Sequence, residues 1–190
     1  MNKLEQKILD EGKILNGNIL KVDNFLNHQV DPELMMYIGN KFFEYFKNRG
    51  ITKVLTLEVS GISMALTTAH FLQVPMVFAK KIESRTLSDD VYESKVISFT
   101  KKKEYIIRVD KQYLNSNDKV LIIDDFLANG KALNGLIDLC YQAKSEIIGI
   151  GIAIEKSFQI GGKKARQNGY DVYSIAKVKK LEDGKIEFEY

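Results

Sequence analysis

Two consecutive carboxylates, Asp124 and Asp125, follow an apolar run and precede a loop of small residues. The apolar run, residues 119–123, predicts a buried strand, and in open α/β sheets ligands bind at the carboxyl ends of strands. The loop ends with the small residues 128–130, after which an apolar pattern typical of a helix begins. The unpaired N–H groups at a helix start favour an anion, and small side chains let a phosphate approach closely. This segment therefore predicts a phosphate site beside two acids that can accept hydrogen bonds from sugar hydroxyls.

The rest of the pattern predicts a frame of alternating strands and helices. Helices are expected from Asp31 to Gly50, from Gly61 to Phe71, and after Gly130 with a buried face that includes Leu136. Strands are expected at residues 51–57, 76–79, 105–109, 119–123, 146–155, 172–178 and 186–188. Residues 81–103 read as a long loop or an irregular hairpin, which in compact domains is usually functional. The order predicts an α/β fold with an open, twisted, mostly parallel sheet flanked by helices, in a single domain spanning residues 1–190.

Bulk composition narrows the class of protein. The chain has 190 residues, 45% of them hydrophobic, and its net charge of +3 comes from 28 basic and 25 acidic residues. So small an excess predicts a mixed surface without general affinity for nucleic acid. The one cysteine, Cys140, falls in an apolar helical pattern and is expected to be a packed, unreactive thiol, and no zinc-like spacing occurs. Without a signal-peptide pattern or an apolar run of membrane-spanning length, the chain is expected to be cytoplasmic.

Residues 120–132 resemble the motif by which type I phosphoribosyltransferases bind phosphoribosyl pyrophosphate (PRPP): an apolar run, two acids, two variable residues, then Ala-Thr-Gly-Gly-Thr. The tail here is Ala128, Asn129, Gly130, Lys131 and Ala132. Main-chain contacts to a phosphate survive these changes, and Asn129 can still donate to a phosphate oxygen, whereas the hydroxyls of the family's threonines are lost.

With these departures from the general motif, the sequence resembles one subfamily, the bacterial xanthine phosphoribosyltransferases. The similar stretches are residues 20–29, Leu-Lys-Val-Asp-Asn-Phe-Leu-Asn-His-Gln, residues 124–130, Asp-Asp-Phe-Leu-Ala-Asn-Gly, and residues 154–159, Ile-Glu-Lys-Ser-Phe-Gln. The resemblance covers nearly the whole chain. It implies a purine-salvage transferase that joins PRPP to xanthine, releases pyrophosphate, needs Mg²⁺ carried by PRPP rather than held by the protein, and forms a homodimer.

The resemblance also implies roles for particular residues. Asp124 and Asp125 would face the ribose, and residues 128–132 would hold the 5′-phosphate. The pyrophosphate would be met by residues after the first and second strands, namely Glu58, Ser60, Gly61, Lys80 and Lys81. Residues 84–103 would form a mobile hood that closes over PRPP.

The base site would be built from two parts of the chain. Lys156 would donate to the 6-oxygen of the purine, and an N-terminal lobe of about residues 1–35 would contribute Leu20 and Asn27. Phe158 could stack on the base, although a phenylalanine near a strand end more often belongs to the core. His28 is expected to be an ordinary surface histidine.

Three alternatives accompany this interpretation. The first is a phosphoribosyltransferase for guanine or hypoxanthine, which Lys156 does not exclude, whereas adenine carries a donor at position 6. The second is a PRPP-sensing purine transcription regulator, which would be expected to have an added DNA-binding domain and a strongly basic face. The third, a dinucleotide-binding domain, would need a glycine-rich turn after a strand, whereas Gly149 and Gly151 lie within an expected strand.

Overall fold

The centre of the protein is a mostly parallel sheet. We analysed a computed structural model that describes residues 1–15, 19–81, 90–98, 103–182 and 184–189. In these residues six strands form one sheet in the order β10-β9-β8-β7-β3-β4. All neighbours are parallel except β10, which runs antiparallel to β9. The strands are β3 (Lys53–Leu57), β4 (Met76–Ala79), β7 (Lys119–Leu127), β8 (Glu146–Lys156), β9 (Val172–Glu182) and β10 (Lys185–Phe188).

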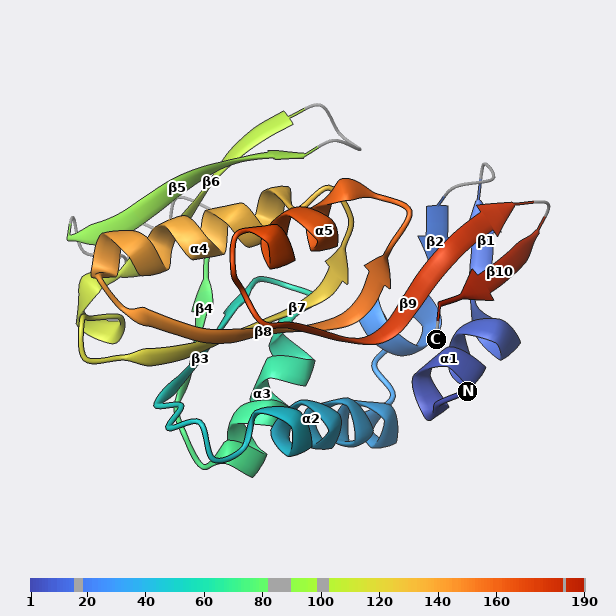
Figure 1. Cartoon of the computed structure of the whole chain (residues 1–190), viewed down its shortest axis with the longest axis horizontal. Coiled ribbons are helices and arrows are strands. Elements are labelled where there is room, and N and C mark those ends of the chain that lie inside the picture. Colours follow the sequence, from blue (N-terminus) through green and yellow to red (C-terminus); the bar gives the residue numbers. More distant parts are fainter. Residues whose placement is uncertain (16–18, 82–89, 99–102, 183, 190) are drawn as a thin grey trace.

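Helices cover both faces of this sheet (Figure 1). The bounds are α2 (Pro32–Phe46) and α3 (Ile62–Leu72) on one face, and α4 (Lys131–Ala143) and α5 (Ile160–Gln167) on the other. Strand β7 shows why: Leu121 and Ile123 belong to the apolar cluster under α2 and α3, while Val120 and Ile122 belong to the cluster under α4. Successive side chains of a strand point to opposite faces, so a continuous apolar run requires cover on both sides. The predicted three-layer α/β fold is confirmed.

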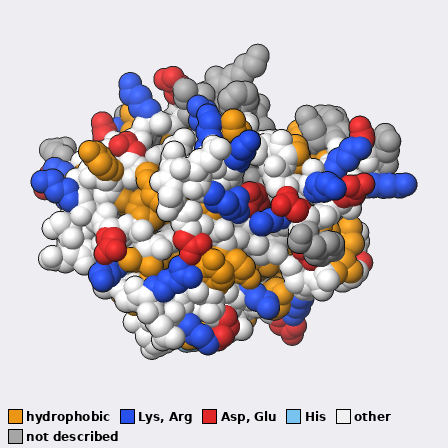
Figure 2. Space-filling model, viewed as in Figure 1, with side chains coloured by type: hydrophobic (Ala, Val, Ile, Leu, Met, Phe, Trp, Pro, Cys, Tyr) orange, Lys and Arg blue, Asp and Glu red, His pale blue; other side chains and the backbone are white. Residues whose placement is uncertain are grey.

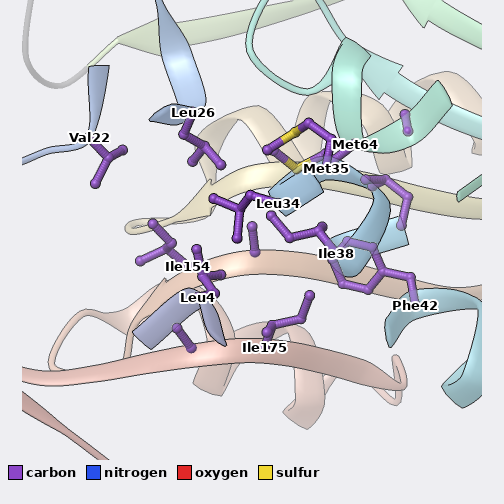
Figure 3. Close-up of a cluster of buried hydrophobic side chains, with 14 of the residues drawn as sticks. Leu4, Val22, Leu26, Leu34, Met35, Ile38, Phe42, Met64, Ile154 and Ile175 are labelled. Carbon is purple, nitrogen blue, oxygen red and sulfur yellow. The ribbon is translucent and has the colours of Figure 1, made fainter. Parts of the chain in front are cut away.

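The N-terminal segment forms a small lobe beside β9 and β10. It consists of α1 (Lys3–Glu11), β1 (Lys13–Leu15), β2 (Ile19–Lys21) and the π-helical turn η1 (Asp23–Asn27). Leu4, Val22 and Leu26 insert into the apolar cluster that also holds Ile38 of α2 and Ile175 of β9 (Figure 3). The lobe is therefore packed onto the same core as the sheet.

An antiparallel hairpin lies over α4 (Figure 1). Strands β5 (Val91–Ser98) and β6 (Lys103–Asp110) pair along their whole length, and the short 3₁₀ turn η2 (Lys111–Tyr113) follows them. Gly135 of α4 gives the hairpin room, because a Cβ there would lie 2.6 Å from Val96 and 2.9 Å from Ile107. The expected loop or irregular hairpin at 81–103 is thus a regular hairpin at residues 91–98 and 103, while residues 84–89 and 99–102 of the expected hood lie outside the described residues.

The surface carries both signs of charge. Figure 2 shows Lys and Arg side chains interspersed with Asp and Glu side chains on the viewed face, with scattered apolar side chains between them. No helix in the described part of the chain is long and apolar enough to cross a membrane.

Candidate active site

Asp124 and Asp125 lie near the carboxyl end of β7, in the middle of the sheet. The strand expected at residues 119–123 ended before both acids, and this was wrong, because β7 stays paired with β8 as far as Leu127. The long apolar run of β8 supplies backbone partners beyond the point where β7 itself stops being apolar. The acids therefore stand on a rigid strand rather than on a loop.

The two carboxyls have different surroundings. Asp124 is 6% exposed, and its Oδ1 accepts a hydrogen bond from the Asp125 amide at 3.0 Å. Burial, followed by the nearby Asp125 carboxylate, raises the pKa of Asp124 well above its usual value, and Lys81 opposes this only in part. Asp125 is half-buried. Such a pair provides fixed negative charge and hydrogen-bond acceptors at the mouth of the sheet.

The predicted phosphate residues are Ala128, Asn129 and Gly130 in the loop after β7 and Lys131 and Ala132 at the start of α4. Gly130 has φ +78°, a left-handed conformation that glycine adopts freely, and Lys131 is the first residue of α4. No side chain caps this helix, so N–H groups of its first turn remain free to meet an anion.

A second helix supports this loop from outside. The Gly161 amide of α5 donates to the Ala128 carbonyl at 2.9 Å. A Cβ on Gly130 would lie 3.2 Å from the Gly161 Cα, so the two glycines let the backbones meet. Sequence reasoning missed Gly161, and the glycine pair 161–162 shortly after a strand was the one available signal.

A pocket of about 130 Å³ joins the acids to the predicted pyrophosphate residues. Its lining comes from β3, β6, β7, the start of α4 and the loops after β3 and β4: Leu57, Glu58, Ser60, Gly61, Lys81, Tyr105, Asp124, Asp125, Phe126 and Ala132. The structure thus brings together three segments that are far apart in the sequence, because the parallel strands β3, β4 and β7 all end at this edge.

Contacts with Lys81 and with Thr56 of β3 determine the conformation of the loop after β3. The peptide between Glu58 and Val59 is cis, and the Glu58 carboxylate accepts a hydrogen bond from the Lys81 amide. A Cβ on Gly61 would lie 2.1 Å from Thr56 Oγ1, so glycine is required for the loop to fold back over β3. This close approach gives a packing reason for glycine at position 61, beside the role that the resemblance implies.

The two predicted lysines differ in position. Lys81 lines the pocket, whereas Lys80 is not among the lining residues, and its backbone forms a bridge with Arg108 of β6 through hydrogen bonds of 2.9 and 3.0 Å. That bridge brings the hairpin to the site and places Tyr105 in the pocket wall. Burial, with a smaller contribution from Asp124, raises the pKa of the Tyr105 hydroxyl. Tyr105 was missed because hairpin register cannot be read from an isolated strand pattern.

Of the predicted base residues, Lys156 adjoins this pocket through Phe126. Lys156, at the end of β8, holds its Nζ 5.9 Å from the Phe126 ring centroid, and burial lowers the pKa of this amine. Phe126 also packs against the apolar cluster that contains Leu20 of β2. Asn27 ends η1, and its Oδ1 is buried without a hydrogen-bond partner in the described residues. A buried acceptor left unpaired is expected where a ligand donor completes the site.

Three further side chains were assessed from the sequence. Phe158 is 46% exposed, so the preferred core assignment was wrong: the chain turns outward between β8 and α5. His28 is exposed, as expected. Cys140 is a buried free thiol, and burial raises its pKa to about 12, which confirms the predicted inert role.

The described residues contain no group of three His, Cys, Asp or Glu side chains that could hold a metal ion. Two adjacent carboxylates offer only oxygen donors, which suits a Mg²⁺ ion that brings phosphate oxygens of a substrate as its remaining ligands.

Comparisons with known proteins agree with this geometry. Residues 22–182 match the family described as phosphoribosyl transferase domain. The xanthine phosphoribosyltransferase of Acinetobacter baumannii is 53% identical over 188 residues, covering 99% of this chain and 98% of that protein. The protein of the same name from Finegoldia magna is 51% identical over 189 residues and covers both chains completely.

Solved structures agree at the level of the fold. The adenine phosphoribosyltransferase of Giardia lamblia in complex with 9-deazaadenine has a TM-score of 0.76 at 22% identity, covering 93% of this chain and 98% of that one. The Trypanosoma brucei enzyme, in complex with AMP, pyrophosphate and ribose-5-phosphate, also has a TM-score of 0.76, at 19% identity, covering 92% of this chain and 79% of that one. Since the family match spans most of the chain and the relatives are alike over its whole length, the chain belongs to the phosphoribosyl transferase domain family.

Proposed function

We propose that this protein is an enzyme of purine salvage that transfers the 5-phosphoribosyl group of PRPP to xanthine, giving xanthosine 5′-monophosphate (XMP) and pyrophosphate. In this reaction the bond between ribose C1 and the pyrophosphate oxygen breaks, and its electron pair leaves with pyrophosphate. A ring nitrogen of xanthine bonds to C1, and the proton of that nitrogen is released. The observation that carries the proposal is identity of 51–53% over the whole chain to proteins named for that activity.

The acids would act on the ribose. Asp124 and Asp125 accept hydrogen bonds from its hydroxyls, and their negative charge stabilises the ring as positive charge builds on it during bond breaking. Because the pair is fixed on β7 and Asp124 is buried, little reorganisation is needed at that moment. Mg²⁺ bound with PRPP would neutralise charge on the departing pyrophosphate.

The phosphates would be held mainly by backbone. Residues 128–132 offer the free amides at the start of α4 to the 5′-phosphate. Glu58, Ser60, Gly61 and Lys81 line the part of the pocket that pyrophosphate would occupy. Lys80 does not line it, so a role for its side chain would depend on closure of the site or on a neighbouring subunit.

Base choice would depend on Lys156, Asn27 and the apolar wall around Leu20, with the lobe of residues 1–35 as one side of the site. Lys156 donates to the 6-oxygen, and the unpaired Oδ1 of Asn27 accepts from a purine N–H. We also propose that the enzyme is a homodimer. We propose further that it works in the cytoplasm, a reducing compartment in which a free thiol such as Cys140 stays reduced.

A competition assay tests the function. The protein is mixed with PRPP, Mg²⁺ and equal amounts of xanthine, guanine, hypoxanthine and adenine, and the nucleotides formed are separated and quantified. XMP should dominate, with guanine and hypoxanthine poorer in kcat/KM. Equal or better use of guanine would overturn the choice of xanthine but keep the reaction class, and absence of any nucleotide would overturn both.

A further inference from the structure

An ion pair between the buried Glu155 and the partly exposed Arg166 lies next to the proposed base lysine along β8. Glu155, which precedes Lys156 on β8, is only 3% exposed. Both of its carboxylate oxygens accept from the Arg166 guanidinium at 2.7 Å, and the Ser174 hydroxyl of β9 donates to the same group. Burial disfavours ionisation of Glu155, yet the hydrogen bonds from Arg166 and Ser174 outweigh it and hold its pKa below the usual value.

The geometry of this pair gives orientation more than stability. A two-point Arg–carboxylate contact fixes both groups in one plane, whereas the free energy gained by burying such a pair is largely offset by lost hydration. Arg166 belongs to α5 and Glu155 to β8, so the pair fixes the angle at which the helix leaves the strand. The turn between β8 and α5 also contacts the proposed base lysine, since the Gln159 amide donates to the Lys156 carbonyl at 2.9 Å.

The second and third residues of α5 are glycines for reasons of space. A Cβ on Gly162 would lie 1.9 Å from Glu155 Oε1. A Cβ on Gly161 would lie 2.4 Å from the Ala128 carbonyl oxygen and 2.7 Å from the Gly130 nitrogen, both in the phosphate loop. Neither glycine has a left-handed φ, so backbone conformation does not require glycine at either position.

Helix α5 therefore touches both halves of the site. Its start lies against the loop expected to hold the 5′-phosphate, and its C-terminal half is anchored to the residue next to Lys156. We propose that Glu155, Arg166 and Gly161 are positioning residues, which hold the 5′-phosphate loop and the base lysine at a fixed separation so that ribose C1 and the base nitrogen meet. This inference rests on the proposed function and adds three residues to it that do not line the substrate pocket.

Gly161→Ala tests the contact with the loop. The added methyl group meets only backbone atoms, so the loop itself must move, and a displacement of this kind costs on the order of 10²-fold in kcat/KM. Gly169→Ala is the matched control: it lies just beyond the same helix at φ +87°, where a Cβ would meet nothing within 4 Å, so it strains the backbone without touching the loop.

The direct readout is the affinity for ribose 5-phosphate, measured by calorimetry without any base. We expect binding weaker by about 10-fold or more for Gly161→Ala and binding close to wild type for Gly169→Ala, with both variants folded by circular dichroism. Ribose 5-phosphate affinity within about twofold of wild type for Gly161→Ala would overturn the positioning role. Because no base is present, this result does not depend on whether xanthine is the substrate, which the competition assay decides separately.

Arg166 variants test the other end of the helix. Arg166→Ala should raise KM for both xanthine and PRPP, and Arg166→Lys should fall between it and wild type, since lysine restores the charge but not the planar two-point contact. A purely structural pair would lower Tm and the fraction of active enzyme while leaving both KM values unchanged. That pattern would refute the coupling.

Discussion

The substitution Asp124→Asn keeps the size of the side chain and removes a carboxyl whose ionisation is disfavoured by its burial in the fold. The Asp124 carboxyl is buried beside Asp125, and for both reasons its pKa stands well above 3.8 in the folded protein. A carboxyl with a raised folded pKa stabilises the fold only while protonated, and this contribution disappears as pH rises through the folded pKa. As pH rises, ionising Asp124 therefore costs the wild-type protein stability, whereas the neutral amide of the variant carries no such cost.

The size of the effect follows from the linkage between pKa and stability. Each pKa unit above the unfolded value corresponds to about 1.4 kcal/mol. For a chain of this length, 1 kcal/mol shifts Tm by about 2–4 °C. Since about 1.4 kcal/mol corresponds to about 3–6 °C on this scale, we expect Asp124→Asn to raise Tm measurably at pH 7.5, and the gain should shrink as pH is lowered. The kcat should fall by about 10²-fold, because a carboxylate contributes most once the ribose is cationic.

The two effects are measured on the same samples. Scanning calorimetry without ligands gives Tm between pH 5 and pH 8, and XMP formation at saturating PRPP, Mg²⁺ and xanthine gives kcat. Asp10→Asn, at an exposed position of α1, controls for the loss of one charge and should change neither value appreciably. A variant that is less stable at pH 7.5 and keeps normal kcat would show that Asp124 is a structural group, and both the electrostatic argument and the assigned role would be wrong.

Three other substitutions have distinct expected results. Lys156→Ala should lower kcat/KM for xanthine by about 10- to 100-fold, because the 6-oxygen of the base loses its hydrogen-bond donor. The affinity for PRPP, measured by calorimetry, should stay unchanged. Loss of PRPP binding with a normal KM for xanthine would instead place Lys156 on a phosphate. Urea titrations should show that wild type exceeds Glu155→Gln in unfolding free energy by a difference that is largest above pH 4.5 and shrinks at lower pH. The reason is that the folded pKa of Glu155 is lowered, and a difference that stays constant with pH would contradict this. Gly130→Ala should lower stability by about 1 kcal/mol at its left-handed φ and raise KM for PRPP in the same preparations, whereas normal kinetics would show that the loop tolerates the side chain.

The sequence was most informative where one short segment carries both a structural and a chemical pattern. The apolar run of β7, the two acids and the small residues before α4 are contiguous, so the centre of the site could be placed without knowledge of tertiary contacts. Glu58, Ser60 and Gly61 were expected from the family resemblance, and they lie beside the acids because parallel strands end at one edge of the sheet. Tyr105 reaches the pocket only through the pairing of two hairpin strands and the bridge from Lys80 to Arg108, and neither contact leaves a local signal.

The N-terminal lobe was predicted as a contributor to the base site but not as a set of elements. Helix α1 has only Leu4 and Ile8 as buried apolar residues, and its start is fixed by a capping box between Asn2 and Glu5. Each of β1 and β2 has three residues, too few for a strand period to be recognised. These elements form because the lobe packs against α2 and β9, which is tertiary information.

Helix α5 is the element that local sequence argues against most strongly, and the reason for this bears on function. Its sequence, Ile-Gly-Gly-Lys-Lys-Ala-Arg-Gln, places two glycines in the first turn, where each costs about 1 kcal/mol relative to alanine. The helix has little apolar surface to compensate, and it is held instead by the Arg166–Glu155 contact and by the amide of Gly161 on the phosphate loop. Natural sequences tend to violate local preference where a site requires it. The glycines of α5 are such a violation, because larger residues would fit a helix better but would collide with the phosphate loop at Gly161 and with Glu155 at Gly162.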